Sequence, residues 1–298
     1  MRDAFIIKHN KGSLELCKVT RIMGILNVTP DSFSDGGLFY DLDKALAHAH
    51  KMLREGVDII DVGGESTRPG SKPVSEDEEL RRVIPVIQEL SKETDKPISI
   101  DTYKSRVAEK AIEAGAQIIN DISGLKADRE MARVAAANRA PIIINHIKGQ
   151  PHNMPENPIY ENLISEVMHG LRQSIDLAVK SGINEDAIII DPGIGFGKTT
   201  QHNLEILNRL EEFKSLERPI MVGTSRKSFI GHVLGLPLQE RLIGTAATIA
   251  VAIIKGAKIV RVHDVKEAVQ VVLICDAIRN AGSTPDLIRG KIEPAKLN

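Results

Sequence analysis

The chain has few of the residues that would bind nucleic acid, carbohydrate or an anionic membrane. It contains no Trp and only 3% aromatic residues, and its 39 basic and 40 acidic residues leave a formal net charge of -1. Base-stacking surfaces need aromatic side chains, and nucleic-acid or membrane surfaces need a basic patch. The composition therefore disfavours nucleic acid, carbohydrate and membranes as partners, and it predicts an aliphatic core.

Cysteine and long apolar runs are scarce as well. Cys17 and Cys275 stand alone, without Cys-x-x-Cys or His-Glu-x-x-His spacing, so neither a disulfide framework nor a structural zinc site is indicated. The N-terminus lacks the apolar segment of a secretion signal, and no stretch approaches the roughly 20 apolar residues of a membrane span. We therefore expect a cytoplasmic protein whose two cysteines fill the core.

What the chain does have is a repeat. Apolar, β-branched runs alternate with amphipathic stretches about every 34 residues, which is typical of strand-helix units. The predicted strands are 22–28, 57–62, 97–101, 117–121, 141–146, 187–191, 219–223 and 258–263. The predicted helices are 42–55, 75–92, 105–114, 129–137, 159–180, 203–213, 241–255 and 265–280.

Eight such units in series predict an α/β fold, a single (β/α)8 TIM barrel, with a doubly wound open sheet as the alternative. Before the first unit, residues 6–18 with Asn10-Lys11-Gly12 at their centre predict a β-hairpin that covers the bottom of the barrel. No segment has the composition of a linker. We therefore expect one domain over 1–298, with a hairpin extension (1–20), the barrel (21–282) and a C-terminal tail (283–298).

Polar side chains stand where most of the predicted strands end. A single one could be a helix N-cap or a loop residue. Barrels of this kind keep their active sites at the carboxyl ends of the strands, so several together predict an active site on that rim. The residues are Asn27, Asp61, Asp101, Asn120, Asp121, Asn145, His146, Asp191, Arg261 and His263.

The loops after these strands add further groups. Segments 27–37 and 63–70 are long, and we expect them to act as lids. Segment 191–199 has neither Walker nor dinucleotide-fingerprint spacing, so its glycines predict a flexible loop that lets backbone approach a ligand. Segments 225–228 and 261–264 supply cations and hydroxyls after the last two strands, which predicts an anionic substrate. Arg226 and Lys227 could instead be a solvated pair. Cations are unfavourable beside the helix dipole at a helix N-terminus, however, so a functional role is favoured.

In order and spacing, these motifs resemble the dihydropteroate synthase family, which joins a pterin to 4-aminobenzoate in folate synthesis. The resemblance runs from about Arg21 to the last predicted helix. It is carried by MGILNVTPDSFSDGG (23–37), DVGGESTRPG (61–70), IDT (100–102), ND (120–121), DPGIGFGKT (191–199), SRKS (225–228) and RVHD (261–264).

The resemblance implies a transferase that condenses a dihydropterin-methyl diphosphate with 4-aminobenzoate, and a homodimer. It implies four catalytic residues that also bind the pterin: Asp101, Asp191, Lys227 and Arg261. Asn120 joins them on the pterin edge, while Arg261 lies on the pterin face. These residue types suit the task, because carboxylates and carboxamides bind the ring's N–H donors in a planar way.

The remaining roles also follow from the resemblance. The diphosphate is assigned to Asn27, Arg68, Arg261 and His263. A Mg²⁺ cofactor is assigned to Asn27 with Asp31 and Asp35, and hard oxygen ligands suit that ion. The 4-aminobenzoate is assigned to Phe33, Thr67, Arg68, Pro69, Phe196, Lys227 and Ser228.

One position departs from the family pattern. Asn145 places a polar group where the family often offers the pterin an apolar contact, whereas His146, Gly149 and Pro151 are kept. Two alternatives stay open: a methyltetrahydrofolate-type methyltransferase domain, which would not need the 225–228 motif or the Thr67–Pro69 segment, and a non-catalytic pterin-binding or partner-binding homologue. The small and apolar residues of 245–254 could form a dimer face, although a buried helix explains them as well.

Overall fold

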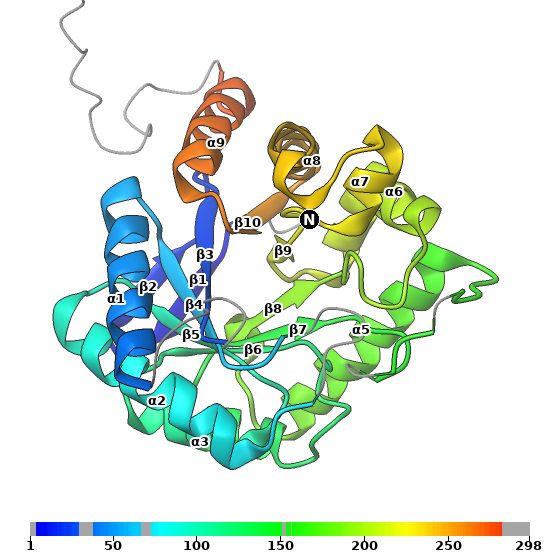
Figure 1. Ribbon diagram of the computed structural model, residues 1–298. Helices are drawn as coiled ribbons and strands as arrows, with labels where there is room; N and C mark the ends of the chain where they lie inside the picture. The colour runs from blue at the N-terminus through cyan, green and yellow to red at the C-terminus, as the bar shows by residue number, and fades with distance from the viewer. Residues whose placement is uncertain (1–3, 30–37, 67–72, 151–152, 156, 282–298) are drawn as a thin grey trace, which may run out of the picture.

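A closed barrel of eight parallel strands forms the centre of the molecule, in the order β10-β3-β4-β5-β6-β7-β8-β9 (Figure 1). The computed structural model describes residues 4–29, 38–66, 73–150, 153–155 and 157–281. The predicted barrel is confirmed and the open-sheet alternative is wrong. Its strands are β3 (Arg21–Asn27), β4 (Ile59–Gly63), β5 (Ile98–Asp101), β6 (Ile118–Asp121), β7 (Ile142–Asn145), β8 (Ile188–Asp191), β9 (Ile220–Val222) and β10 (Ala257–Val262).

Helices surround the barrel and follow its strands along the chain (Figure 1). The α-helices are α1 (Leu38–Glu55), α2 (Glu76–Glu93), α3 (Ser105–Glu113), α4 (Met131–Ala137), α5 (Leu163–Lys180), α6 (Thr200–Asn208), α7 (Ser228–Leu234), α8 (Leu242–Ile254) and α9 (Val265–Arg279). Short 3-10 helices are η2 (Glu185–Ala187), η3 (Leu210–Leu216) and η4 (Leu238–Glu240). None of the described helices is long and apolar enough to cross a membrane.

Side-chain caps explain where several helices start. Ser75 accepts a hydrogen bond from the Glu78 backbone N–H, as its capping-box spacing predicts. Thr199 and His202 form a reciprocal capping box, so α6 starts at Thr200 rather than at the predicted position 203. Asn162 accepts from the Ser165 backbone N–H, and α5 therefore starts four residues after the predicted start at 159.

Two helical predictions need correction. The predicted helix 203–213 is two elements, because α6 ends at Asn208 and the chain continues as η3. The seven-residue α7, which ends at Leu234 and is capped by Gly235 in the left-handed conformation, was missed because so short a segment shows little periodicity. Cys275 is buried as expected, whereas Cys17 is only half-buried.

The barrel interior begins with an aliphatic layer that the hairpin covers. Strands β1 (Ile6–His9) and β2 (Gly12–Glu15) pair antiparallel, and Ile7 lies opposite Leu14. Both pack with residues near the amino ends of the barrel strands, which confirms the predicted hairpin. The buried cluster comprises Phe5, Ile7, Leu14, Leu16, Met23, Ile59, Ile118, Ile143, Ile189, Met221 and Ile259.

Two residues further along the strands that supply this layer, most of the inward side chains are polar. Because strand side chains alternate between faces, the next inward position follows the aliphatic one by two residues. These positions hold Ile25, Asp61, Asn120, Asn145, Asp191, Gly223 and Arg261. Asp61, Asn120, Asn145 and Asp191 are all buried. The fold therefore gathers its buried polar atoms toward the carboxyl ends of the strands.

Candidate active site

Arg261 lies at the centre of this polar layer, between two carboxylates. Its Nε donates to Asp61 Oδ2 at 2.6 Å, and its Nη2 donates to Asp101 Oδ2 at 2.6 Å. Asn120 Nδ2 donates to the same Asp61 oxygen at 3.1 Å. Residues from β10, β4, β5 and β6 thus form one hydrogen-bonded group, and the strand register places Asp101 beside Asn120.

Burial sets the charge balance of this group. Burial raises the pKa of Asp101 to about 7, against the opposing attraction of Arg261. Burial alone would lower the pKa of Arg261, but the charges of Asp61 and Asp101 outweigh it and raise that pKa. The arginine is therefore cationic throughout, while Asp101 can change its protonation near neutral pH.

Lys227 and Asp191 form the second part of the site. Lys227 Nζ donates to the Ile194 carbonyl and lies 4.3 Å from the centre of the Phe196 ring. Burial lowers the pKa of Lys227 to about 8, although the nearby Asp191 charge opposes this shift. Burial also raises the pKa of Asp191. Burial therefore disfavours the charged form of both groups.

The 191–199 loop approaches the end of β7 closely. The Gly193 N–H donates to Asp191 Oδ1 at 2.7 Å, and Gly193 has φ +75°. A Cβ at this position would overlap the His146 carbonyl oxygen, so only glycine fits. Close approach explains the glycine here, but the neighbour is protein backbone rather than the ligand that the sequence predicted.

Lys198, the lysine of the apparent phosphate-loop motif, binds protein instead. Its Nζ lies 3.1 Å from His146 Nδ1 and donates to the carbonyls of His146 and Phe196, at 3.2 and 3.1 Å. Burial lowers the pKa of His146 to about 2 and holds the pKa of Lys198 well below its usual value. These contacts connect the 191–199 loop to the end of β7. They agree with the sequence, in which the spacing of a Walker phosphate loop is absent.

The adjacent cations Arg226 and Lys227 have different environments. Arg226 pairs with Asp264 through two contacts of 2.9 and 2.5 Å, and its side chain is 37% exposed. Lys227 faces the polar layer instead. The solvated-pair alternative therefore fits Arg226 and the functional reading fits Lys227. Beside them, Ser225 Oγ lies 2.9 Å from His263 Nδ1.

Comparison with known proteins decides the family. The profile described as "Pterin binding enzyme" matches residues 23–263. A dihydropteroate synthase of Bacillus subtilis is 52% identical, over 94% of this chain and 96% of that protein. The chain belongs to the dihydropteroate synthase family. It is therefore a transferase.

Solved members of the dihydropteroate synthase family share this fold. The Clostridium difficile enzyme, solved in the presence of pteroic acid, is 49% identical with a TM-score of 0.83, over 88% of this chain and 97% of that one. The Yersinia pestis enzyme, in a complex with a sulfonamide drug, is 44% identical with a TM-score of 0.88, over 93% and 100%. These names favour the synthase over the methyltransferase alternative.

The described residues that resemblance assigned to this family's site lie at the carboxyl ends of the barrel strands or in the segments that follow. They are Asn27, Asp101, Asn120, Asp191, Phe196, Lys227, Ser228, Arg261 and His263. Six further residues of the prediction lie outside the described part of the chain: Asp31, Phe33, Asp35, Thr67, Arg68 and Pro69. Their roles stay predictions.

Two other rim residues are structural. Asp121 faces away from the barrel interior and accepts hydrogen bonds from the backbone N–H groups of Ser123 and Leu125, both at 2.8 Å. This matches the loop role that a single polar residue can have. His146 binds Lys198 as described above. Asp61, in contrast, contacts Arg261 and Asn120 of the predicted site, although only its place on the rim was predicted.

Asn145, the position that departs from the dihydropteroate synthase pattern, is also in the polar layer. Its Nδ2 donates to the Ile122 carbonyl at 2.9 Å. Its Oδ1 is buried and has no hydrogen-bond partner among the described residues. On β7 it lies in register with Asp191 on β8.

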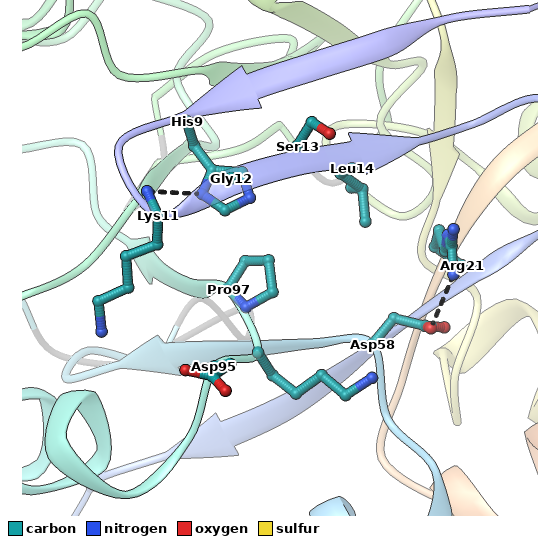
Figure 2. Close-up of a pocket in the computed structure, with 10 residues that line it drawn as sticks. His9, Lys11, Gly12, Ser13, Leu14, Arg21, Asp58, Asp95 and Pro97 are labelled. Atoms are coloured by element: carbon teal, nitrogen blue, oxygen red, sulfur yellow. Dashed lines mark hydrogen bonds and ion pairs between the residues drawn. The ribbon is translucent and has the colours of Figure 1, made fainter.

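A pocket at the opposite end of the barrel does not belong to this site. Figure 2 shows its lining side chains between the hairpin and the amino ends of the barrel strands, with Arg21 directed at Asp58. The pocket measures about 260 Å³, and the Arg21–Asp58 pair spans 3.3 Å. Because the predicted site residues lie at the other ends of the strands, this pocket is separate from the active site.

Proposed function

We propose that the chain condenses (7,8-dihydropterin-6-yl)methyl diphosphate with 4-aminobenzoate to give 7,8-dihydropteroate and diphosphate. The observation that carries this proposal is the buried group of Asp101, Asn120 and Asp191 with two cations, Arg261 and Lys227. Relatives support it, since Xanthomonas albilineans enzymes are solved with 4-aminobenzoic acid and with 7,8-dihydropteroate.

The pterin would bind by its edge and its face. Its pyrimidine edge offers N–H donors to Asp101, Asn120 and Asp191, while Lys227 leaves the Ile194 carbonyl to donate to ring acceptors. Arg261 would lie on the pterin face and direct an N–H group at the diphosphate. Buried carboxylates whose N–H partners come from the substrate give a strong preference for that donor pattern.

The substitution would be dissociative. The bond between the pterin methyl carbon and the diphosphate oxygen breaks, and its electron pair leaves with the diphosphate. Arg261 and His263, with Asn27 and Arg68, stabilise the departing charge, and the anions Asp101 and Asp191 stabilise the pterin-methyl cation. The amine lone pair then forms the C–N bond, and the proton leaves the nitrogen afterwards to solvent.

The 4-aminobenzoate would lie beside Lys227. The Lys227 ammonium, which donates to the pterin, lies against the Phe196 ring, so Phe196 offers a flat apolar surface for the aromatic ring of 4-aminobenzoate beside the pterin. Ser228 is exposed at the start of α7 and can donate from its hydroxyl. Phe33, Thr67, Arg68 and Pro69 complete this part of the proposal from outside the described residues.

A Mg²⁺ ion assigned to Asn27, Asp31 and Asp35 also belongs to the proposal. Of its three assigned ligands the structure describes Asn27, whose amide oxygen is a hard donor of the kind that Mg²⁺ prefers. This oxygen lies beside Gly63, 3.8 Å from the position that a side chain there would fill. Bound Mg²⁺ would neutralise charge on the diphosphate as it departs. Among the described residues no group of three His, Cys, Asp or Glu could hold a metal.

The assay is detection of dihydropteroate by mass spectrometry, with diphosphate release, from the purified protein, both substrates and Mg²⁺. Lys227→Met removes the buried ammonium of the site, and we expect a loss of about a hundredfold or more in kcat. Lys258→Met is the matched control, because Lys258 is a buried lysine that donates to the Cys17 carbonyl near the start of β10. Its kcat should stay close to the wild-type value. Absence of product from the wild-type protein would overturn the proposal.

The homodimer is likewise a proposal, and α8 supports it. Its exposed residues form one apolar stripe at helical spacing: Ile243, Ala247, Val251 and Ile254. On α9, which packs beside α8 (Figure 1), Ile274 and Ile278 are exposed too. An apolar surface spread over two neighbouring helices is typical of an interface. The buried-helix interpretation of 245–254 holds for the opposite face, with Thr245 and Ile249.

Light scattering after gel filtration tests the dimer. We expect wild-type protein at twice the chain mass and Val251→Lys at the mass of one chain, because a charged side chain cannot be buried unpaired. Leu177→Lys, on the exposed face of α5, is the control and should leave the mass unchanged. Wild-type protein at the mass of one chain would contradict the proposal. The cytoplasmic location stays a prediction.

A further inference from the structure

Asp61 is a buried carboxylate without a role in the reaction described above. It belongs to β4, its side chain is completely buried, and it faces the barrel interior. One oxygen, Oδ2, accepts hydrogen bonds from two donors, Arg261 Nε at 2.6 Å and Asn120 Nδ2 at 3.1 Å. Both donors belong to residues that the proposed function places against the pterin. Asp61 thus joins the residue on the pterin's face to one on its edge.

Asp101 holds the same arginine in a different way. It binds the terminal nitrogen Nη2, and Asp101 itself is needed for the pterin edge. In the proposed complex the pterin N–H binds the Asp101 carboxylate and the terminal nitrogens of Arg261 turn to the diphosphate, so the substrate would compete with the Nη2 contact. The Nε contact with Asp61 faces no such competition, since Asp61 is closed off from a ligand.

We infer that Asp61 is a positioning residue that anchors Arg261 by Nε while its terminal nitrogens move from Asp101 to the substrate. The same oxygen holds the Asn120 amide ready for the pterin. This inference rests on the proposed function and adds the step by which Arg261 releases Asp101 to the substrate. Asp61 never touches the substrate.

The chemistry of the arginine supports this role. A guanidinium presents five N–H donors in a rigid plane, so an anchor at Nε leaves both terminal nitrogens available. The second Asp61 oxygen, Oδ1, is buried without a partner among the described residues, so the contacts with Arg261 and Asn120 are the ones that compensate this carboxylate. A buried carboxylate is costly without such partners. Its presence between two substrate-binding groups is explained by what it does for them.

The test is Asp61→Asn, which keeps the size and removes the charge. The asparagine oxygen can still accept from both donors, so the variant tests the charge. Arg261 then has only Asp101 as an anionic partner, and this contact competes with the pterin. We expect the Kd of 6-hydroxymethyl-7,8-dihydropterin, measured by calorimetry without the second substrate, to rise about tenfold or more. The KM for 4-aminobenzoate should change far less.

Asp58→Asn is the matched control. Asp58 precedes the same strand at its other end, is also buried, and also pairs with an arginine, Arg21, at 3.3 Å. Its loss should lower the melting temperature but leave pterin affinity and kcat close to wild type. Equal loss of pterin affinity in Asp58→Asn and Asp61→Asn would overturn the positioning role, as would wild-type pterin affinity in Asp61→Asn.

Arg261→Lys gives a second test if Asp61→Asn does not fold. Lysine keeps the charge but has no Nε–H group to anchor, so the variant should show a similar loss of pterin affinity. Where Asp61→Asn does fold, adding it to Arg261→Lys should cost little more, and additive losses would overturn the link between the two residues. A wild-type protein that binds the pterin but forms no product would overturn the proposed function alone, because these affinities could still be compared.

Discussion

At the lower end of the barrel, which the hairpin covers, Asp58 pairs with Arg21. At the opposite, upper end, which holds the candidate site, Asp61 pairs with Arg261. The lower carboxylate also accepts from the Ile22 backbone N–H at 2.7 Å, so fixed backbone completes its contacts. The upper arginine is shared between two carboxylates, one of which has its pKa raised by burial to about 7. The same pair of residue types therefore secures the fold at one end and prepares an exchange of partners at the other.

The layers of inward side chains also differ between the two ends of the barrel. The lower layer is aliphatic and is covered by Ile7 and Leu14 of the hairpin. The upper layer consists largely of polar side chains. Among the described residues Asp61 and Asn145 have buried oxygens without partners there, while Ser99 on β5 has one in the lower layer. Stability is expected to depend mainly on the lower end, and catalysis on the upper end. The following substitutions test that separation.

The largest effect is expected at the upper end of β8. Asp191→Asn keeps an acceptor for the Gly193 N–H but removes the negative charge near Lys227. We expect kcat/KM for the pterin diphosphate to fall about 10²- to 10³-fold. Steady-state kinetics measures it, and Asp186→Asn, an exposed aspartate just before the same strand, is the control. A small effect at Asp191 would remove it from the catalytic residues.

The largest effect on stability is expected in the hairpin. Ile7 is fully buried in the lower layer, so Ile7→Ala should lower the free energy of unfolding by about 2–5 kcal/mol. Denaturant titration measures this, and Ile6→Ala on the exposed face of the same strand should cost much less. Below the unfolding transition, kcat of Ile7→Ala should match wild type. A parallel fall in kcat would show that the two ends are coupled.

The pH dependence sharpens the description of the upper end. Asp101, with its pKa raised by burial to about 7, is ionised and able to accept pterin N–H groups only above that pH. Lys227, with its pKa lowered by burial to about 8, is charged only below that pH. We therefore expect kcat/KM to rise through about pH 7 and fall through about pH 8, with a limit of tenfold per pH unit on each side.

Variants assign the two limbs of this profile. Asp101→Asn should abolish the acidic limb and Lys227→Met the alkaline limb, each on a lower overall rate. A limb that persists in its variant belongs to another group, such as the substrate diphosphate. A flat wild-type profile across neutral pH would contradict both assignments.

The smallest effect is expected at Arg226, next to Lys227 in sequence but outside the polar layer. Arg226→Ala loses a partly exposed ion pair with Asp264, which contributes at most about 1 kcal/mol to stability. Kinetics should stay near wild type, in contrast to Lys227→Met. Comparable losses in the two variants would place Arg226 in the site and blur the distinction between these neighbours.

Most of the fold could be predicted from local pattern. The alternation of apolar runs and amphipathic stretches predicted all eight barrel strands, and Asn10-Lys11-Gly12 predicted the hairpin. Helix starts were harder, because α5 and α6 begin where Asn162 and Thr199 cap them. The short α7 carries too few residues for a periodic signal.

The sequence predicted where the site residues lie, but not which of them contact one another. A polar residue at a strand end, such as Asp101 or Asp191, is visible in the sequence, and resemblance to the family supplied its role. The sequence could not separate Arg226 from Lys227, because adjacent residues face different surroundings only after folding. It also could not assign Lys198, whose partners lie across the loop at His146.

The sequence by itself determined the repeat, the barrel and the family, because periodicity, turn residues and ordered motifs are local properties of the chain. The tertiary structure decided which charges meet. Asp61 and Arg261 are 200 residues apart, and only closure of the barrel places them in one hydrogen bond. Burial in that closed layer then shifts the pKa of Asp101 and of Lys227 toward neutral pH, since desolvation disfavours each charged form.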